Sequence, residues 1–319
     1  MPGSTAIDAE LVERFKNALD RLNPEAGKLG LAVSGGPDSM AMLLLAQEAI
    51  PGGFEVATVD HGLRSEAKDE CALVVSACED RSVPCEVLSV RVGVGNVQTE
   101  ARTARYDALA DWVLRQGLQA IATAHHADDQ VETLLMRLNR GAGLTGLAGI
   151  RARGEWGRQE VQVLRPMLQF RRAELAGVVA ASGLETADDP SNSDRNFDRV
   201  RMRQALAQVQ WVDVASMSAS ASNLAEAAEA LGWVASEEFS RQVRQTGDEW
   251  RYCPLAPRAV RLIVVNRLIV KLGAKPRGGQ VADLVDALQS GSKGNLGGVL
   301  ASVEGAEWVF RPEPPRKTG

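Results

Sequence analysis

A short segment at residues 34–39 combines glycines, hydroxyls and a carboxylate in a way that suits phosphate chemistry. It reads SGGPDS, between an apolar run and a helical pattern. Its glycines let the backbone approach a phosphate, its serines add donors, and its proline suits a first helical turn. The carboxylate fits if Mg²⁺ lies between it and the phosphates, the alternative being a Ser/Gly turn with a capping aspartate. We therefore predict a phosphate loop made of Ser34, Gly35, Gly36, Pro37, Asp38 and Ser39.

A second group of reactive side chains lies at 125–132. The members stand at offsets 0, 3, 4 and 7, which places them near one face of a predicted helix: His125, Asp128, Asp129 and Glu132. Three carboxylates and an imidazole on one face repel one another unless a cation or a basic substrate is present. Mg²⁺ and a lysine ammonium would both meet that need. The alternative is an acidic helix start that complements the helix dipole.

The elements that must position these groups follow an alternating pattern. Apolar runs at 29–33, 54–59, 85–90 and 120–124 predict strands, and periodic stretches at 39–49, 66–81, 98–116 and 127–139 predict helices. The strands do not alternate with polar residues, as expected when both faces of a parallel sheet are covered. This pattern predicts an α/β fold with a doubly wound, mostly parallel sheet, in which ligands lie at the carboxyl ends of strands.

The remainder of the chain predicts a second, smaller and mostly helical domain. Ala-rich and periodic stretches at 216–239, 257–272 and 278–290 predict helices, and 297–311 predicts a hairpin. We place the nucleotide-handling domain at 1–210, the second domain at 211–313 and a disordered tail at 314–319. The first residues lack the apolar run of a signal peptide, no stretch is long enough to span a membrane, and no CxxC pair occurs, so we expect a reduced, cytoplasmic protein.

The net charge of −5 hides two opposite local charges. Residues 1–136 hold 11 basic and 21 acidic groups (−10), whereas 137–203 hold 12 and 8 (+4), and all twelve of those basic groups are arginines. Arginines suit contacts to nucleic-acid phosphates, although pairing with the eight acids of the same stretch is the alternative.

Several further motifs indicate which protein family the sequence resembles. The SGGPDS segment matches the SGGxDS signature of the PP-loop ATP pyrophosphatases. With VDHGLR (59–64), EARTARY (100–106), AHHADDQVET (124–133) and DPSN (189–192) in this order, the sequence resembles the tRNA(Ile)-lysidine synthetases over about residues 29–203. One departure is Val200, where the family pattern commonly has asparagine, so a role of that amide is in doubt here.

The resemblance implies a two-step reaction. ATP adenylates the C2 oxygen of the wobble cytidine in the CAU anticodon of tRNA(Ile), and free L-lysine then displaces AMP. It further implies ATP binding by residues 34–39 with Asp60 and His61, a phosphate clamp and catalytic role for Arg105, and Mg²⁺ on Asp38 and Asp129. His125, Asp128 and Glu132 would orient lysine and cytosine, while the identity of the general base stays open. A subset of the arginines would contact tRNA: Arg140, Arg165, Arg199 and Arg203.

Two other interpretations remain open at this point. A PP-loop tRNA thiolase is the nearest enzymatic alternative, although the spaced cysteine pairs of the iron–sulfur thiolases are absent. A non-catalytic ATP- or RNA-binding module is the other, and the carboxylate set argues against it. The oligomeric state, with a homodimer as one possibility, is not determined by the sequence.

Overall fold

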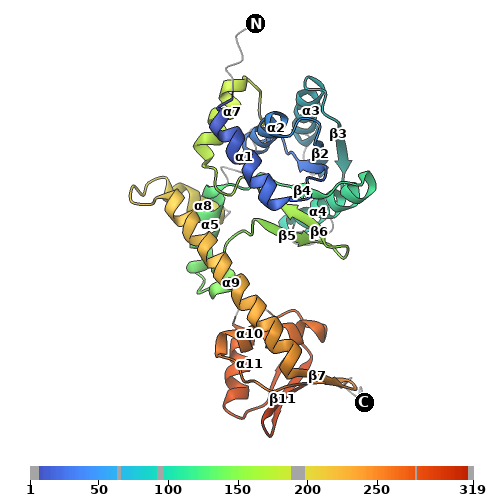
Figure 1. Cartoon of the computed structure of the whole chain (residues 1–319), viewed down its shortest axis with the longest axis vertical. Coiled ribbons are helices and arrows are strands. Elements are labelled where there is room, and N and C mark those ends of the chain that lie inside the picture. Colours follow the sequence, from blue (N-terminus) through green and yellow to red (C-terminus); the bar gives the residue numbers. More distant parts are fainter. Residues whose placement is uncertain (1–6, 63–65, 92–96, 188–197, 277–278, 315–319) are drawn as a thin grey trace. The chain divides into compact units, whose positions relative to one another are not determined.

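The computed structural model describes residues 7–62, 66–91, 97–187, 198–276 and 279–314 (Figure 1). The chain divides into two compact units. The first consists of Met1–Gly141 and Ala148–Ser222, and the second of Ala142–Leu147 and Asn223–Gly319. The division thus falls inside a long helix, α9 (Val214–Gln242), rather than before it at residue 210. Of the tail predicted at 314–319, residues 315–319 lie outside the described part.

The first unit is built on a six-stranded sheet with the order β3-β2-β1-β4-β6-β5. Every neighbouring pair is parallel except β5 with β6, which is antiparallel. The strands are β1 (Leu29–Ala32), β2 (Phe54–Asp60), β3 (Cys85–Ser89), β4 (Ala120–Ala122), β5 (Arg153–Trp156) and β6 (Val161–Leu164). The predicted α/β class and mostly parallel sheet are confirmed, and the edge strand β5 is an addition that the sequence did not predict.

Helices cover both faces of this sheet. The helices that lie wholly in this unit are α1 (Ala9–Leu22), α2 (Pro37–Ala49), α3 (Glu66–Glu79), α4 (Val97–Gln116), α5 (Ala127–Leu138), α7 (Arg172–Ser182) and α8 (Asp198–Leu206). One core cluster joins α1, α2, α3 and α7 to one face, and a second joins α4 to the other. Consecutive strand residues enter opposite clusters, as Val56 and Ala57 do, because successive side chains of a strand point to opposite faces. This explains why the strands are apolar throughout.

Gly30 in the middle of β1 shows how tightly α4 packs on the sheet. A Cβ at this position would lie 2.4 Å from Cζ3 of Trp112, which is fully buried. We expect Gly30→Ala to lower the free energy of unfolding by about 1–3 kcal/mol, because the indole must shift in a filled core. Urea denaturation measures this. Gly177→Ala in α7 is the control, since a Cβ there meets nothing within 4 Å, and an equal loss in both variants would contradict the prediction.

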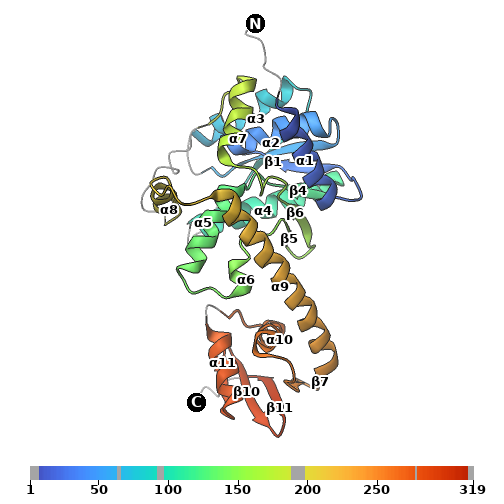
Figure 2. The same cartoon turned by 60° about the vertical axis from the view of Figure 1, so that its left-hand side comes forward.

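The second unit carries more β-structure than the predicted hairpin. Its antiparallel sheet has the order β7-β8-β11-β10-β9, and Figure 2 shows helices beside it. The hairpin is present as β10 (Val299–Glu304) and β11 (Glu307–Pro312), joined by β7 (Val243–Thr246), β8 (Glu249–Tyr252) and β9 (Gly294–Leu296). The helices that belong to this unit are the end of α9, α10 (Arg258–Lys271), α11 (Gln280–Gln289) and the short α6 (Leu144–Leu147).

The three additional strands were missed because they are short and polar. Strand β8 forms ion pairs with its neighbour β11, including Arg251 with Glu307 at 3.4 Å and Glu249 with Arg311 at 2.6 Å. Such residues give no apolar run for a sequence pattern to detect. Across the described residues of both units, we find no helix that combines the length and the apolar character needed to cross a membrane.

Candidate active site

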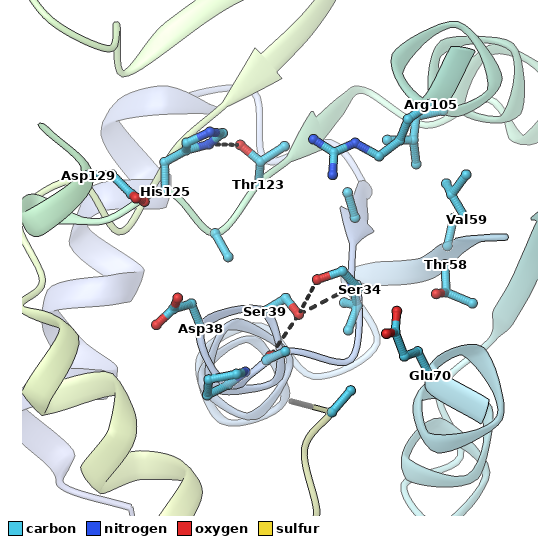
Figure 3. Close-up of a pocket in the computed structure, with 18 of the residues that line it drawn as sticks. Ser34, Asp38, Ser39, Thr58, Val59, Glu70, Arg105, Thr123, His125 and Asp129 are labelled. Carbon is cyan, nitrogen blue, oxygen red and sulfur yellow. Dashed lines mark hydrogen bonds between the residues drawn. The ribbon is translucent and has the colours of Figure 1, made fainter. Parts of the chain in front are cut away.

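The predicted phosphate loop connects β1 to α2 and is held open by its own serines. The backbone N–H of Ser34 donates to Oγ of Ser39 at 3.1 Å, and that hydroxyl donates to the carbonyl of Gly36 at 2.9 Å (Figure 3). Gly35 has a φ of +84°, and a Cβ there would approach the carbonyl of Glu70 to 3.1 Å. The turn therefore requires glycine.

This loop forms one wall of a cavity of about 450 Å³, a size that suits a nucleotide. The cavity lies where the carboxyl ends of β1, β2 and β4 meet, as expected for a doubly wound sheet. Of the predicted site residues, the cavity is lined by Ser34, Gly36, Pro37, Asp38, Ser39, His61, Arg105, His125, Asp129, Arg199 and Arg203. A less polar part of its wall consists of Thr58, Val59, Cys71, Tyr106 and Leu109, which the sequence analysis did not single out.

His126 joins three of the carboxylates behind the cavity wall. Its ring is 2% exposed, with Nε2 at 3.4 Å from Oδ2 of Asp38 and 3.6 Å from Oδ2 of Asp129, and Nδ1 at 3.5 Å from Oδ2 of Asp128. Burial alone would lower the pKa of His126, but the contacts with Asp128 and Asp38 and the charge of Asp129 outweigh it and raise the pKa to about 10. The imidazole is therefore a cation at neutral pH.

Helix α8 supplies two more cations to the same carboxylates. Nη2 of Arg199 lies 2.8 Å from Oδ1 of Asp129, and its Nε donates to Oε2 of Glu132 at 2.7 Å. Nε of Arg203 donates to Oε1 of Glu132, also at 2.7 Å. Glu132 is 2% exposed, so two arginines satisfy a buried carboxylate. The expectation that the carboxylates need an external cation was wrong for the protein alone, because Arg199, Arg203 and His126 balance them.

His125 lines the cavity in positive surroundings. Its Nδ1 is 3.0 Å from the hydroxyl of Thr123, as drawn in Figure 3. Burial, followed by the charges of Arg165, Arg199 and other arginines, lowers the pKa of His125 to about 3, so the ring is neutral at pH 7. Burial also lowers the pKa of Arg105, whose guanidinium lies 5.4 Å from the centre of the Tyr106 ring. These groups present positive charge and hydrogen-bond donors opposite the phosphate loop.

Other predicted site residues, Asp60, Asp128, Glu132 and Arg140, are not part of the cavity lining. Oδ1 of Asp60 accepts the N–H of Gly62 at 2.8 Å, and Oδ2 of Asp128 accepts the N–H of Arg172 at 2.8 Å. Arg140 is exposed and pairs with Asp198 at 3.0 Å.

Arg165, also predicted to contact tRNA, turns inward. It donates to the carbonyl of Arg151 at 2.8 Å, and burial lowers its pKa. Val200 is buried on α8, so the position of the family's usual asparagine belongs to the packing of this helix. The DPSN motif lies outside the described residues.

His126 is the main site residue that the sequence analysis did not select. It stands one residue after His125, so it is not among the offsets 0, 3, 4 and 7 that share one helical face. The signal that could have found it is its place beside His125 in the AHHADDQ motif, directly after a strand.

The residues present fit a magnesium ion shared with phosphates. Among the described residues, no group of three or more His, Cys, Asp or Glu side chains surrounds one point. Mg²⁺ in nucleotide enzymes, however, is commonly held by one or two carboxylates together with substrate phosphates. Asp38 and Asp129 line the same cavity as the phosphate loop, and in the described part of the chain Oδ1 of Asp38 accepts no hydrogen bond. Oδ1 of Asp38 is therefore available beside the predicted phosphate site, and Asp129 lies in the same cavity with its Oδ1 bound to Arg199.

Comparison with known proteins agrees with this geometry. A family model described as a PP-loop domain matches residues 7–210, so the fold and the site define a PP-loop protein, which implies the use of ATP. The tRNA(Ile)-lysidine synthase of Novosphingobium aromaticivorans is 44% identical over 310 residues, covering 96% of this chain and 94% of the relative. That of Zymomonas mobilis is 36% identical, covering 92% and 91%. The chain belongs to the tRNA(Ile)-lysidine synthase family, and the family that the motifs indicated is confirmed.

A solved structure shows the same fold at low sequence identity. The U34-tRNA thiolase NcsA from Methanococcus maripaludis, with its [4Fe-4S] cluster, aligns with a TM-score of 0.56 and 15% identity. The match covers 69% of this chain and 80% of the thiolase. At this identity the likeness concerns the fold alone.

Proposed function

We propose that this chain joins free lysine to C2 of the wobble cytidine in the CAU anticodon of tRNA(Ile), at the expense of ATP. The proposal is based on one observation. A phosphate loop and two carboxylates able to share Mg²⁺, Asp38 and Asp129, meet at a single cavity, and the buried Glu132 is bound by two arginines that line the same cavity. A nucleotide-binding module would need the loop, whereas an enzyme that transfers a cationic amine also needs the carboxylates.

In the first step, residues 34–39 bind the β- and γ-phosphates through backbone N–H groups and hydroxyls. The C2 oxygen of cytidine attacks the α-phosphorus, and the bond from that phosphorus to pyrophosphate breaks. Arg105 faces the loop across the cavity and is placed to stabilise charge on the α-phosphate (Figure 3). Mg²⁺ held by Asp38 and Asp129 would neutralise phosphate charge and draw electrons from the reacting phosphorus.

In the second step, the ε-amine of lysine attacks C2 and AMP leaves with the C2 oxygen. The ammonium must first lose a proton, so a base is required. His125 is a poor base, because its pKa is about 3. We therefore propose that the carboxylates of Asp129 and Glu132 accept this proton. To contact them, the lysine ammonium would replace Arg199 and Arg203 as their partner.

The test is an assay with ATP, Mg²⁺, radiolabelled lysine and a transcript of tRNA(Ile) carrying CAU. We expect one lysine incorporated per tRNA, with equimolar AMP and pyrophosphate. A transcript with UAU is the matched control, since it lacks the wobble cytidine, and it should accept no lysine. ATP binding without lysine transfer to the CAU transcript would contradict the proposal and favour a non-catalytic module.

A further inference from the structure

His126 occupies a position that links separate parts of the proposed metal site. It comes directly before α5, while Asp38 belongs to the first turn of α2, and the two residues are far apart in the chain. The backbone N–H of His126 donates to Oδ2 of Asp129 at 3.1 Å, and its Nε2 lies 3.4 Å from Asp38. One residue therefore contacts both carboxylates that the proposed function places on Mg²⁺.

The side from which His126 contacts the two carboxylates determines which of their oxygens could bind a metal. The His126 ring is 2% exposed, whereas the side chains of Asp38 and Asp129 are 30% and 14% exposed. The imidazole thus lies behind the carboxylates, on their Oδ2 atoms, and the carboxylates lie between it and the cavity. Oδ1 of Asp129 is turned to Arg199, and Oδ1 of Asp38 accepts no hydrogen bond from the described residues. Oδ1 of Asp38 is thus left for a ligand, whereas Oδ1 of Asp129 can bind one only in place of its bond to Arg199.

Without this ring, no other side chain described here contacts both aspartates. Arg199 and the backbone N–H of His126 would still hold Asp129, but the two carboxylates repel each other and the side chain of Asp38 could rotate about its own bonds. A donor that contacts both from behind restricts that rotation. Groups of this kind, which orient ligating side chains without touching the metal, typically change metal affinity by about 10- to 100-fold when removed.

We propose that His126 is a positioning residue that fixes Asp38 against Asp129 so that both carboxylates offer an oxygen to one Mg²⁺. The proposal rests on the proposed function for the presence of the metal and deepens it by assigning a residue that orders the site. The competing explanation is purely local, because His126 is also the residue that caps the start of α5. A capping role would affect folding stability, with no selective effect on metal binding.

The test measures Mn²⁺ binding directly, by the EPR signal of the unbound ion, in the full chain with a non-cleavable α,β-methylene analogue of ATP. Three variants separate the two roles. Glutamine can place an amide nitrogen near the position of Nε2, whereas asparagine is too short and leucine has no donor. We expect His126→Asn and His126→Leu to weaken Mn²⁺ binding by about 10- to 100-fold, and His126→Gln to stay within about threefold of the unaltered protein.

Controls keep the outcomes distinct. Ser218→Ala removes another buried polar side chain of the same unit, which bonds the carbonyl of Leu168 at 3.2 Å outside the cavity, and should leave Mn²⁺ affinity unchanged. If His126→Leu does not fold, the comparison of His126→Asn with His126→Gln still distinguishes a positioning role from a capping role. Unaltered Mn²⁺ affinity in His126→Asn would overturn the proposal, as would equal weakening in all three variants that follows their thermal stability. Lysine transfer by the unaltered protein is a separate measurement, so loss of this proposal would leave the proposed function standing.

Discussion

Replacing Asp38 by asparagine is expected to reduce adenylation by about 10²- to 10⁴-fold while the protein stays folded. Asp38 lines the cavity beside the phosphate loop and is 30% exposed there, so its charge is directed at the site rather than at the core. Asparagine keeps the shape and a carbonyl oxygen near His126, but it loses the negative charge that a divalent cation requires. Release of pyrophosphate in the presence of tRNA, with and without lysine, measures the first step alone.

Asp8→Asn is a suitable control for this variant. Asp8 caps α1 by accepting the N–H of Glu10 at 2.9 Å, and it lies outside the cavity. Its substitution removes the same charge from the same unit and should leave the rate of pyrophosphate release unchanged. Unaltered pyrophosphate release by Asp38→Asn, at magnesium concentrations near the KM, would remove Asp38 from the proposed metal site.

The second large effect is expected for Glu132→Gln, which should abolish lysine transfer and lower the free energy of unfolding by about 2–3 kcal/mol. Glu132 is buried and accepts Nε of both Arg199 and Arg203 at 2.7 Å. Removing one partner of a buried ion pair typically costs 3–5 kcal/mol. The loss here should be smaller, since the side chains of Arg199 and Arg203 are 42% and 29% exposed and water can replace part of the contact.

A double-mutant cycle separates the contribution of the pair from that of the single groups. In a protein that already carries Arg203→Met, Glu132→Gln should cost about 1 kcal/mol less, because one uncompensated guanidinium has been removed. Chemical denaturation measures both steps of the cycle. Glu155→Gln on the exposed edge strand β5 serves as the matched control and should change neither stability nor lysine transfer. Additive effects of Glu132→Gln and Arg203→Met would show that the two side chains are not coupled.

Much of the first unit could be predicted from the sequence because its signals are local. The strands of the parallel sheet are apolar on both faces, so they stand out in the chain, and the SGGPDS segment lies at a strand–turn–helix junction that any doubly wound fold places at the sheet edge. The second unit was harder to predict. Arg244 of β7 and Glu249 of β8 form ion pairs with side chains of β11, so the residues that stabilise these two strands resemble a solvated loop when only the sequence is considered.

The arginines of residues 137–203 also show what could not be predicted from the sequence. The excess of arginine over 137–203 predicted contacts to nucleic acid, but the sequence could not say which arginines face outward. In the structure, Arg199 and Arg203 line the cavity and bind its carboxylates, while Arg140 is exposed and paired with Asp198. The difference depends on where α8 lies in the fold, which no spacing within α8 reveals.

The sequence by itself determined which chemical groups this protein brings to its substrates: a phosphate loop, a cluster of carboxylates and an arginine-rich stretch, each contiguous in the chain. Only the tertiary structure decided how these groups are combined. Arg199 meets Asp129 across 70 residues, Arg203 meets Glu132 across 71, and His126 reaches Asp38 from a different strand end. Local patterns report the conformation of neighbouring residues, whereas the balance of charge in a buried site depends on elements that approach only when the sheet and its helices have packed.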